Sequence, residues 1–195
     1  MIRLKSDDIK QAALKHFSTH GYEGASLSKI AEEVGLKKQS LYSHFKNKDD
    51  LFLQVLRDAG EVELQTKLTF FNNRQDPSPE KSLYAFLVMV KELFQLDERM
   101  KFWLRISFFP PEHLYHLIGN EVLAIEDQVR KMLEAKFAEW MSKEQIFVEK
   151  PRIPASAFMG IVDALMIELV YDSSPERINE KLESAWTVFW RGISK

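Results

Sequence analysis

The chain of 195 residues contains no cysteine, which excludes disulfides, thiolate metal sites and cysteine nucleophiles. It lacks an apolar run approaching the roughly 18 residues that a membrane helix needs, and its N-terminal MIRLKSDDIK has no apolar signal-peptide core. We therefore expect a cytoplasmic location and no membrane partner. GxSxG, P-loop, GxGxxG and HExxH motifs are absent too, so we expect neither an enzyme nor a cofactor.

Strand-like alternation is nearly absent, whereas helical periodicity runs through the whole chain. The seven prolines fall between the apolar-periodic segments, where they punctuate helices without breaking them. Hydrophobic residues make up 45 % of the chain and charged residues 29 %, which is typical of a soluble globular protein. The sequence predicts an all-α fold of about nine helices.

Four helices are predicted in the first quarter of the chain. The first covers residues 6–20 with Ser6 as its N-cap, and the second starts after Ser26 and stops at Gly35. A short third helix covers residues 38–45, and Asn47 caps the fourth. Two short helices joined at a glycine after a longer supporting helix indicate a helix-turn-helix, although any small three-helix bundle gives the same pattern.

Between residues 34 and 48 the chain has only basic charges, although its formal net charge is −2. These charges are Lys37, Lys38, Lys46 and Lys48. A short basic run is usually just solvated surface. In a helix-turn-helix, however, the second helix enters the major groove and flanking cations bind phosphate, so an acid there would be unfavourable. Leu41 and Phe45, one turn apart, would then face the core.

The stretch ALKHFSTHGYEGASLSKIAEEVGLKKQSLYSHFKNKDDLF resembles the N-terminal DNA-binding domain of the tetracycline-repressor-like (TetR) family. The matching elements are A-x-x-x-F, G-Y and S-x-x-x-I-A-x-x-x-G, followed by L-Y-x-H-F-x-x-K-x-x-L-F. The resemblance covers about residues 6–55. It implies a three-helix helix-turn-helix domain over residues 1–47, followed by a larger helical ligand-binding and dimerisation domain over residues 48–195.

By position, the resemblance implies a set of DNA-binding residues on the second helix, the third helix and the start of the fourth. The set is Ser26, Ser28, Lys29, Lys37, Lys38, Gln39, Ser40, Tyr42, His44 and Lys48. Two positions depart from the common pattern. Lys37 stands where many members have a Ser or Thr cap, which weakens the third helix by about 1 kcal/mol. Gln39 stands where many have a small residue, and its amide can pair with adenine.

The larger part of the chain is rich in aromatic residues and holds all four tryptophans. Around residues 102–109 they occupy more than one helix face, which fits either core packing or the effector cavity that the resemblance implies. The candidate ligand-binding residues are Tyr84, Phe102, Trp103, Phe109, His113, His116 and Asp163. The two histidines are three apart, and pocket or surface positions are favoured over a metal site. Asp163 faces a pocket, pairs across an interface or is exposed.

The last two helical segments are apolar over a broad arc, which favours a partner. The resemblance implies a four-helix bundle between two copies, built from Phe158, Ile161, Val162, Leu165, Leu169, Leu182, Trp186, Phe189 and Trp190. The leading hypothesis is a ligand-responsive transcriptional repressor that binds palindromic operator DNA as a homodimer and is released by a small apolar or aromatic effector. The alternatives are a helical protein-interaction module or a small enzyme without a nucleic-acid role.

Overall fold

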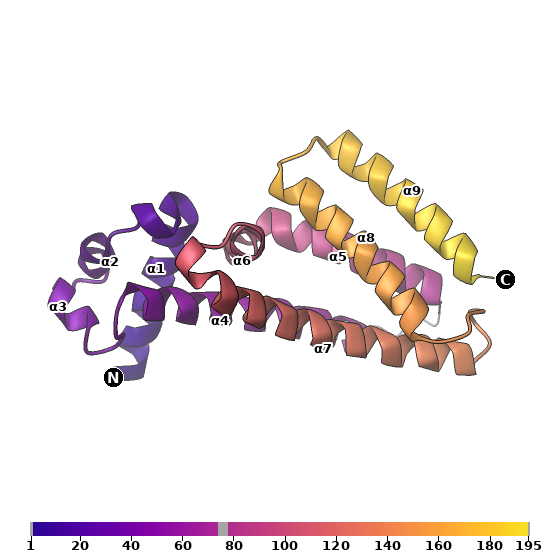
Figure 1. Ribbon diagram of the computed structural model, residues 1–195, viewed down its shortest axis with the longest axis horizontal. Coiled ribbons are helices and arrows are strands. Elements are labelled where there is room, and N and C mark those ends of the chain that lie inside the picture. Colours follow the sequence, from indigo (N-terminus) through magenta and orange to yellow (C-terminus); the bar gives the residue numbers. More distant parts are fainter. Residues whose placement is uncertain (1, 74–77, 195) are drawn as a thin grey trace. The chain divides into compact units, whose positions relative to one another are not determined.

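The computed structural model describes residues 2–73 and 78–194, and the side chains from residue 6 onward within them. Every regular element in these ranges is helical (Figure 1). The elements are α1 (Ile2–Gly24), α2 (Leu27–Glu33), α3 (Lys38–Leu41), α4 (Lys48–Asn73), α5 (Pro79–Leu96), α6 (Glu98–Phe108), the 3₁₀ helix η1 (Glu112–Leu114), α7 (Tyr115–Ser142), α8 (Arg152–Val170) and α9 (Pro175–Ile193). The predicted all-α fold is confirmed.

The chain divides into two compact units, each described by itself. The first comprises Met1–Glu63 and Asp97–Val122, and the second comprises Leu64–Leu96 and Leu123–Lys195. The predicted domain boundary after residue 47 marks the end of the DNA-binding motif, whereas these two units are defined by their internal contacts. The boundary at residue 47 therefore stays a prediction.

In the first unit, α1 presents one apolar face, with Ile9, Ala13 and Phe17 buried as the i, i+4, i+8 spacing predicts. The helix begins at Ile2, so Ser6 lies inside it and is not the N-cap that the sequence predicts. Near its end the backbone breaks at Gly21, where φ is 68° and ψ is −178°. That combination is open essentially to glycine alone, so Gly21 turns the chain toward α2.

The helices α2 and α3 are held by local backbone bonds around a glycine turn. Gly35 has φ +69°, and its N–H donates to the Glu32 carbonyl, which closes α2 as predicted. The third helix has only four residues, so the predicted extension to residue 45 is wrong. Its N-cap Lys37 forms no side-chain cap bond, which gives the helix little support. Phe45 is still buried.

A reciprocal cap starts α4 and fixes the connection from α3. The Asn47 Oδ1 accepts from the Asp50 N–H at 2.8 Å, and the Asp50 Oδ2 accepts from the Lys46 N–H at 2.8 Å. Each carboxamide or carboxylate oxygen thus satisfies a backbone donor that the helix start leaves open. The predicted cap at Asn47 is confirmed.

The second unit has an aromatic core in which α8 packs against both α5 and α9. The Phe86 and Phe158 ring centroids lie 5.8 Å apart, and those of Phe158 and Phe189 lie 5.6 Å apart. All three side chains are buried. Burial of this size makes each ring a main contributor to the stability of the unit.

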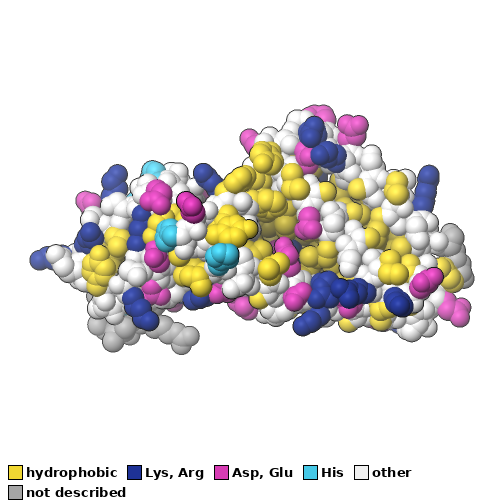
Figure 2. All heavy atoms as spheres, viewed as in Figure 1, with side chains coloured by type: hydrophobic (Ala, Val, Ile, Leu, Met, Phe, Trp, Pro, Cys, Tyr) yellow, Lys and Arg dark blue, Asp and Glu magenta, His cyan; other side chains and the backbone are white. Residues whose placement is uncertain are grey.

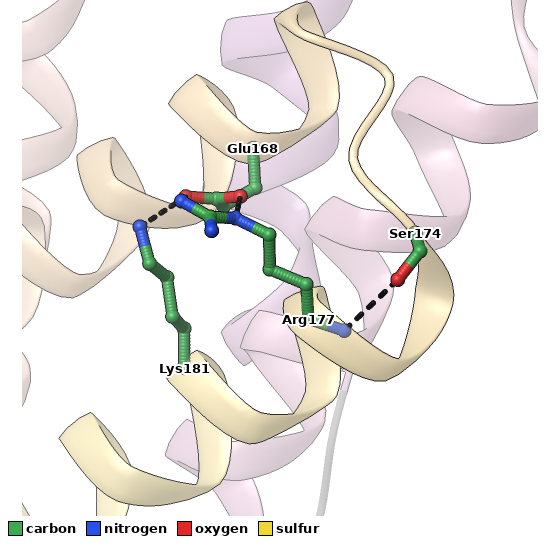
Figure 3. Close-up of polar contacts among 4 residues, drawn as sticks. All are labelled: Glu168, Ser174, Arg177 and Lys181. Atoms are coloured by element: carbon green, nitrogen blue, oxygen red, sulfur yellow. Dashed lines mark hydrogen bonds and ion pairs between the residues drawn. The ribbon is translucent and has the colours of Figure 1, made fainter.

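An ion cluster ties the end of α8 to the start of α9 (Figure 3). The Glu168 side chain is 4 % exposed and accepts from the Arg177 Nε at 2.7 Å and from the Lys181 ammonium. These bonds, the one from Arg177 foremost, lower the pKa of Glu168 to about 2. Ser174 caps α9 by accepting from the Arg177 N–H. Two side chains of α9 thus hold the end of α8, and the cap at Ser174 fixes where α9 begins.

By length and composition, one helix among the described residues could cross a membrane. This helix is α8, with a mean hydropathy of 1.8 and 39 % of its apolar window buried. The finding corrects the expectation that no segment approaches that length. A core helix of a globular protein has the same character, and α8 packs against two helices here.

Candidate nucleic-acid interface

The short helices α2 and α3 form a helix-turn-helix supported by α1. In the first unit, α1 packs against α2, and α2 packs against α3. Ile30 and Ala31 bury one face of α2, and Leu41 and Phe45 bury the inner side of the following segment. This packing decides which side chains of the two helices stay outside.

The outward face carries the predicted basic residues. Lys29, Lys37, Lys38 and Gln39 are exposed, and Tyr42 is 50 % exposed. Lysine and arginine side chains lie at the surface over α3 in Figure 2. Within residues 2–73 and 78–194, the first three lysines make no ion pair with an acid. Their charges are thus available to an external anion.

The remaining members of the predicted set lie beside these lysines in the sequence. Ser28 is exposed, whereas Ser26, Ser40 and His44 are partly buried. Ser26 is the N-cap of α2, as predicted, but its hydroxyl makes no cap hydrogen bond. Binding of an external group to this hydroxyl would therefore break no cap hydrogen bond of α2.

The last predicted residue, Lys48, belongs to a cluster at the start of α4. Its ammonium lies 4.5 Å from the centroid of the Tyr22 ring, and it donates to the Glu23 carbonyl at 3.4 Å. The Tyr22 hydroxyl donates to the Asp49 Oδ1, and the His113 Nε2 lies 3.2 Å from that oxygen. The sequence motif includes Tyr22 as part of its G-Y element, but it does not predict the contact with Asp49.

The Asp49 carboxylate accepts hydrogen bonds from two ring side chains, and these bonds shift the pKa values of the cluster. The hydrogen bond from Tyr22 lowers the pKa of Asp49, and the bond from His113 acts in the same direction. Burial, together with the bond to Asp49, raises the pKa of Tyr22. Tyr22 therefore stays protonated and keeps donating.

The predicted ligand-binding residues fall in both units. In the first, Phe102 and Trp103 are buried, and Phe102 lies 5.6 Å from Phe52 between ring centroids. Phe109 is 53 % exposed, and the exposed His116 lies against the Tyr115 ring, with centroids 5.4 Å apart. Two of the five thus fill a core, and His113 contacts Asp49.

The other two ligand candidates lie in the second unit. Tyr84 donates to the Glu183 carboxylate, and its ring centroid lies 5.5 Å from that of Trp186. Asp163 is exposed as a residue, yet partial burial of its carboxyl raises its pKa, and the charge of Lys67 opposes that rise. Water reaches this side of α8 in the single chain, so the Asp163 carboxyl is solvated there.

Each unit also contains a cleft of small-molecule size. In the first, a cleft of about 410 Å³ lies among α1, α4 and α6, with Lys10, Asp58 and Arg99 on its walls. In the second, a cleft of about 480 Å³ lies along α5 beside Phe70 and is lined by Tyr84. Tyr84 is thus the predicted ligand residue that lines one of these two clefts.

The predicted interface residues lie mostly inside their own chain. Leu169 and Trp190 are partly buried, and the other seven are buried between α5, α8 and α9. The apolar side chains that remain open on the α8–α9 pair are their neighbours, with Ile167 at 41 % and Val188 at 74 % exposure. A partner would meet these neighbours first.

An all-α chain with an exposed basic helix-turn-helix near one end has the fold of helix-turn-helix DNA-binding proteins. Residues 9–55 match the family described as bacterial regulatory proteins, tetR family. The match covers the helix-turn-helix and the start of α4, and the resemblance seen in the motifs of this region is confirmed.

Curated relatives are negative regulators. The chain is 32 % identical over 105 residues to the biofilm operon icaADBC HTH-type negative transcriptional regulator IcaR of Staphylococcus epidermidis, covering 53 % of this chain and 54 % of that protein. The match thus spans about half the length of this relative. The chain is 27 % identical over 145 residues to IcaR of Staphylococcus aureus, covering 74 % of this chain and 73 % of that protein.

Solved structures share the fold over nearly the whole chain. A putative TetR-family regulator from Mesorhizobium loti has a TM-score of 0.79 at 19 % identity, covering 99 % of this chain and 98 % of that one. NalD of Pseudomonas aeruginosa, the secondary repressor of the MexAB-OprM multidrug efflux pump, has a TM-score of 0.71 at 22 % identity, covering 100 % of this chain and 99 % of that one. FadR of Bacillus subtilis, solved with stearoyl-CoA, has a TM-score of 0.69 at 16 % identity, covering 93 % of this chain and 96 % of that one.

Proposed function

We propose that the protein is a ligand-responsive transcriptional repressor that binds palindromic operator DNA as a homodimer. The single observation that carries this proposal is the row of exposed lysines on α2 and at the start of α3, which lies over the buried Leu41 and Phe45. The kinship with negative regulators supports repression over activation. We also propose that the protein acts in the cytoplasm and catalyses no reaction.

In this proposal α3 enters the major groove. Gln39 reads a base edge, because its amide offers both a donor and an acceptor to adenine. The lysines bind phosphates, which gives affinity without sequence preference. The full contact set is Ser26, Ser28, Lys29, Lys37, Lys38, Gln39, Ser40, Tyr42, His44 and Lys48.

The second copy pairs through α8 and α9 and sets the spacing of the two recognition helices. The exposed Ile167 and Val188 support this choice of face, because a partner would remove both from water. A palindromic site then follows from the two-fold symmetry.

The effector we propose is small and apolar or aromatic, and it binds better to the arrangement that fits DNA poorly. Only such differential affinity shifts the population, since equal affinity for both arrangements shifts nothing. Tyr84, Phe102, Trp103, Phe109, His113, His116 and Asp163 stay the candidate contacts, and Tyr84 has the support of a cleft beside it.

A mobility-shift assay on the DNA upstream of the protein's own coding sequence tests this function, combined with sedimentation of the complex. We expect two chains per duplex and a log affinity that falls linearly with log salt. A protein that stays monomeric and leaves the duplex unshifted in dilute buffer would contradict the proposal. Binding of a protein partner that is lost on exchange of Val188→Glu, with no DNA binding, would favour the interaction-module alternative.

A further inference from the structure

The cluster around Tyr22 joins three segments of the first unit. Tyr22 lies in the last turn of α1, Lys48 and Asp49 begin α4, and His113 lies in η1 between α6 and α7. Asp49 is 27 positions from Tyr22 and 64 positions from His113 along the chain. The Asp49 carboxylate at the start of α4 therefore binds both the end of α1, through Tyr22, and the segment between α6 and α7, through His113.

The chemistry of the cluster sets the direction of its hydrogen bonds. An ionised carboxylate only accepts, so the Tyr22 hydroxyl and the His113 Nε2–H both donate to the same oxygen, Asp49 Oδ1. The Tyr22 and His113 rings also contact each other, with centroids 5.0 Å apart. His113 therefore contacts both Asp49, which accepts the hydrogen bond from Tyr22, and the Tyr22 ring itself.

The ammonium of Lys48 lies over the face of this Tyr22 ring. At 4.5 Å from the centroid, the Lys48 Nζ lies within the range of a cation–π contact, and its tie to the Glu23 carbonyl is long at 3.4 Å. The orientation of the Tyr22 ring thus decides where the Lys48 charge is held.

We infer that His113 is a positioning residue for the phosphate contact at Lys48, acting through Asp49 and Tyr22. The inference rests on the proposed function, because it needs Lys48 to meet DNA. His113 touches no DNA in this account. Its position in η1 means that a shift of the α6–α7 connection would release the ring under Lys48 and weaken the phosphate contact.

The test measures binding to a random-sequence duplex at several salt concentrations, because a phosphate contact needs no operator. We expect His113→Ala to weaken binding about two- to fivefold for each chain that contacts the duplex, the range of one exposed cation–π contact. In a Lys48→Ala background the same exchange should have no further effect. The salt slope of His113→Ala should fall toward that of Lys48→Ala, a change that a general loss of stability would not produce.

Three further variants make the result specific. His113→Gln keeps an N–H donor for Asp49 and should restore most of the affinity, and Tyr22→Phe keeps the ring but loses the bond and should weaken binding. His20→Ala is the matched control, since this exposed histidine of α1 lies against His16, with ring centroids 5.9 Å apart, and belongs to no predicted contact set. Thermal unfolding of each variant identifies any that fail to fold. If His113→Ala is one of them, Tyr22→Phe takes its place, because it also breaks the bond to Asp49.

The outcomes separate the two proposals. If the unaltered protein binds the duplex while His113→Ala binds equally well with the same salt slope, the inference about His113 is overturned and the proposed function stands. Additive losses in the double variant overturn it too. If the unaltered protein ignores DNA at low salt, both fall together.

Discussion

The exposed lysines of the helix-turn-helix lead to a prediction about salt. Lys29, Lys37 and Lys38 are exposed and Lys48 is partly buried, which gives four candidate phosphate contacts in each chain. Each contact adds about 0.9 to the slope of log affinity against log salt, so a dimer using all four should show a slope of about −7. Lys38→Ala removes one contact per chain and should reduce the slope by about 1.8.

That change in slope is measurable. Between 50 and 200 mM salt, the affinity of the unaltered dimer should fall about twelvefold more than that of Lys38→Ala. Fluorescence anisotropy with a labelled duplex gives both slopes. Lys136→Ala is the matched control, because it removes the same charge from a lysine on α7 that already pairs with Glu139 at 3.2 Å. Equal slopes for Lys38→Ala and this control would refute the phosphate contact.

Three other predictions follow from particular contacts. Gln39→Ala should change which bases are preferred more than it changes overall affinity, and selection from a randomised operator library would reveal it. Gly35→Ala should lower the free energy of unfolding in urea by about 1–2 kcal/mol, because φ there is +69°, whereas Gly119→Ala within α7 should not destabilise. Glu168 has a folded pKa of about 2 against an ordinary 4.5, so its contribution is full above about 4.5 and is lost as the pH falls toward 2. Over that window the melting temperature should fall less in Glu168→Gln than in the unaltered chain.

Local patterns predicted the parts of the fold that depend on neighbouring residues. The spacing of Leu41 and Phe45 placed both in the core, and the side chain of Asn47 marked the start of α4. The extent of α3 was misjudged because periodicity continued to Phe45, while the backbone left the helix after Leu41. At the N-terminus, Ser6 resembled a cap although the helix had begun at Ile2.

Contacts between distant residues could not be predicted from such patterns. The broad apolar arcs of α8 and α9 predicted a partner, and this stays a prediction, but Phe158 and Trp186 are already buried within their own chain. Likewise, nothing in the spacing of His113 pointed to Asp49, since their meeting depends on how α6 packs against α1. A contact of this kind is set by tertiary packing.

The lysine face of α2 and α3 is proposed to bind operator DNA in two symmetric copies. Footprinting on the DNA upstream of the protein's own coding sequence, at stated salt, can test this. We expect one protected site with two inverted half-sites about one helical turn apart, centre to centre. Protection of a single unrepeated half-site, or none in dilute buffer, would contradict it.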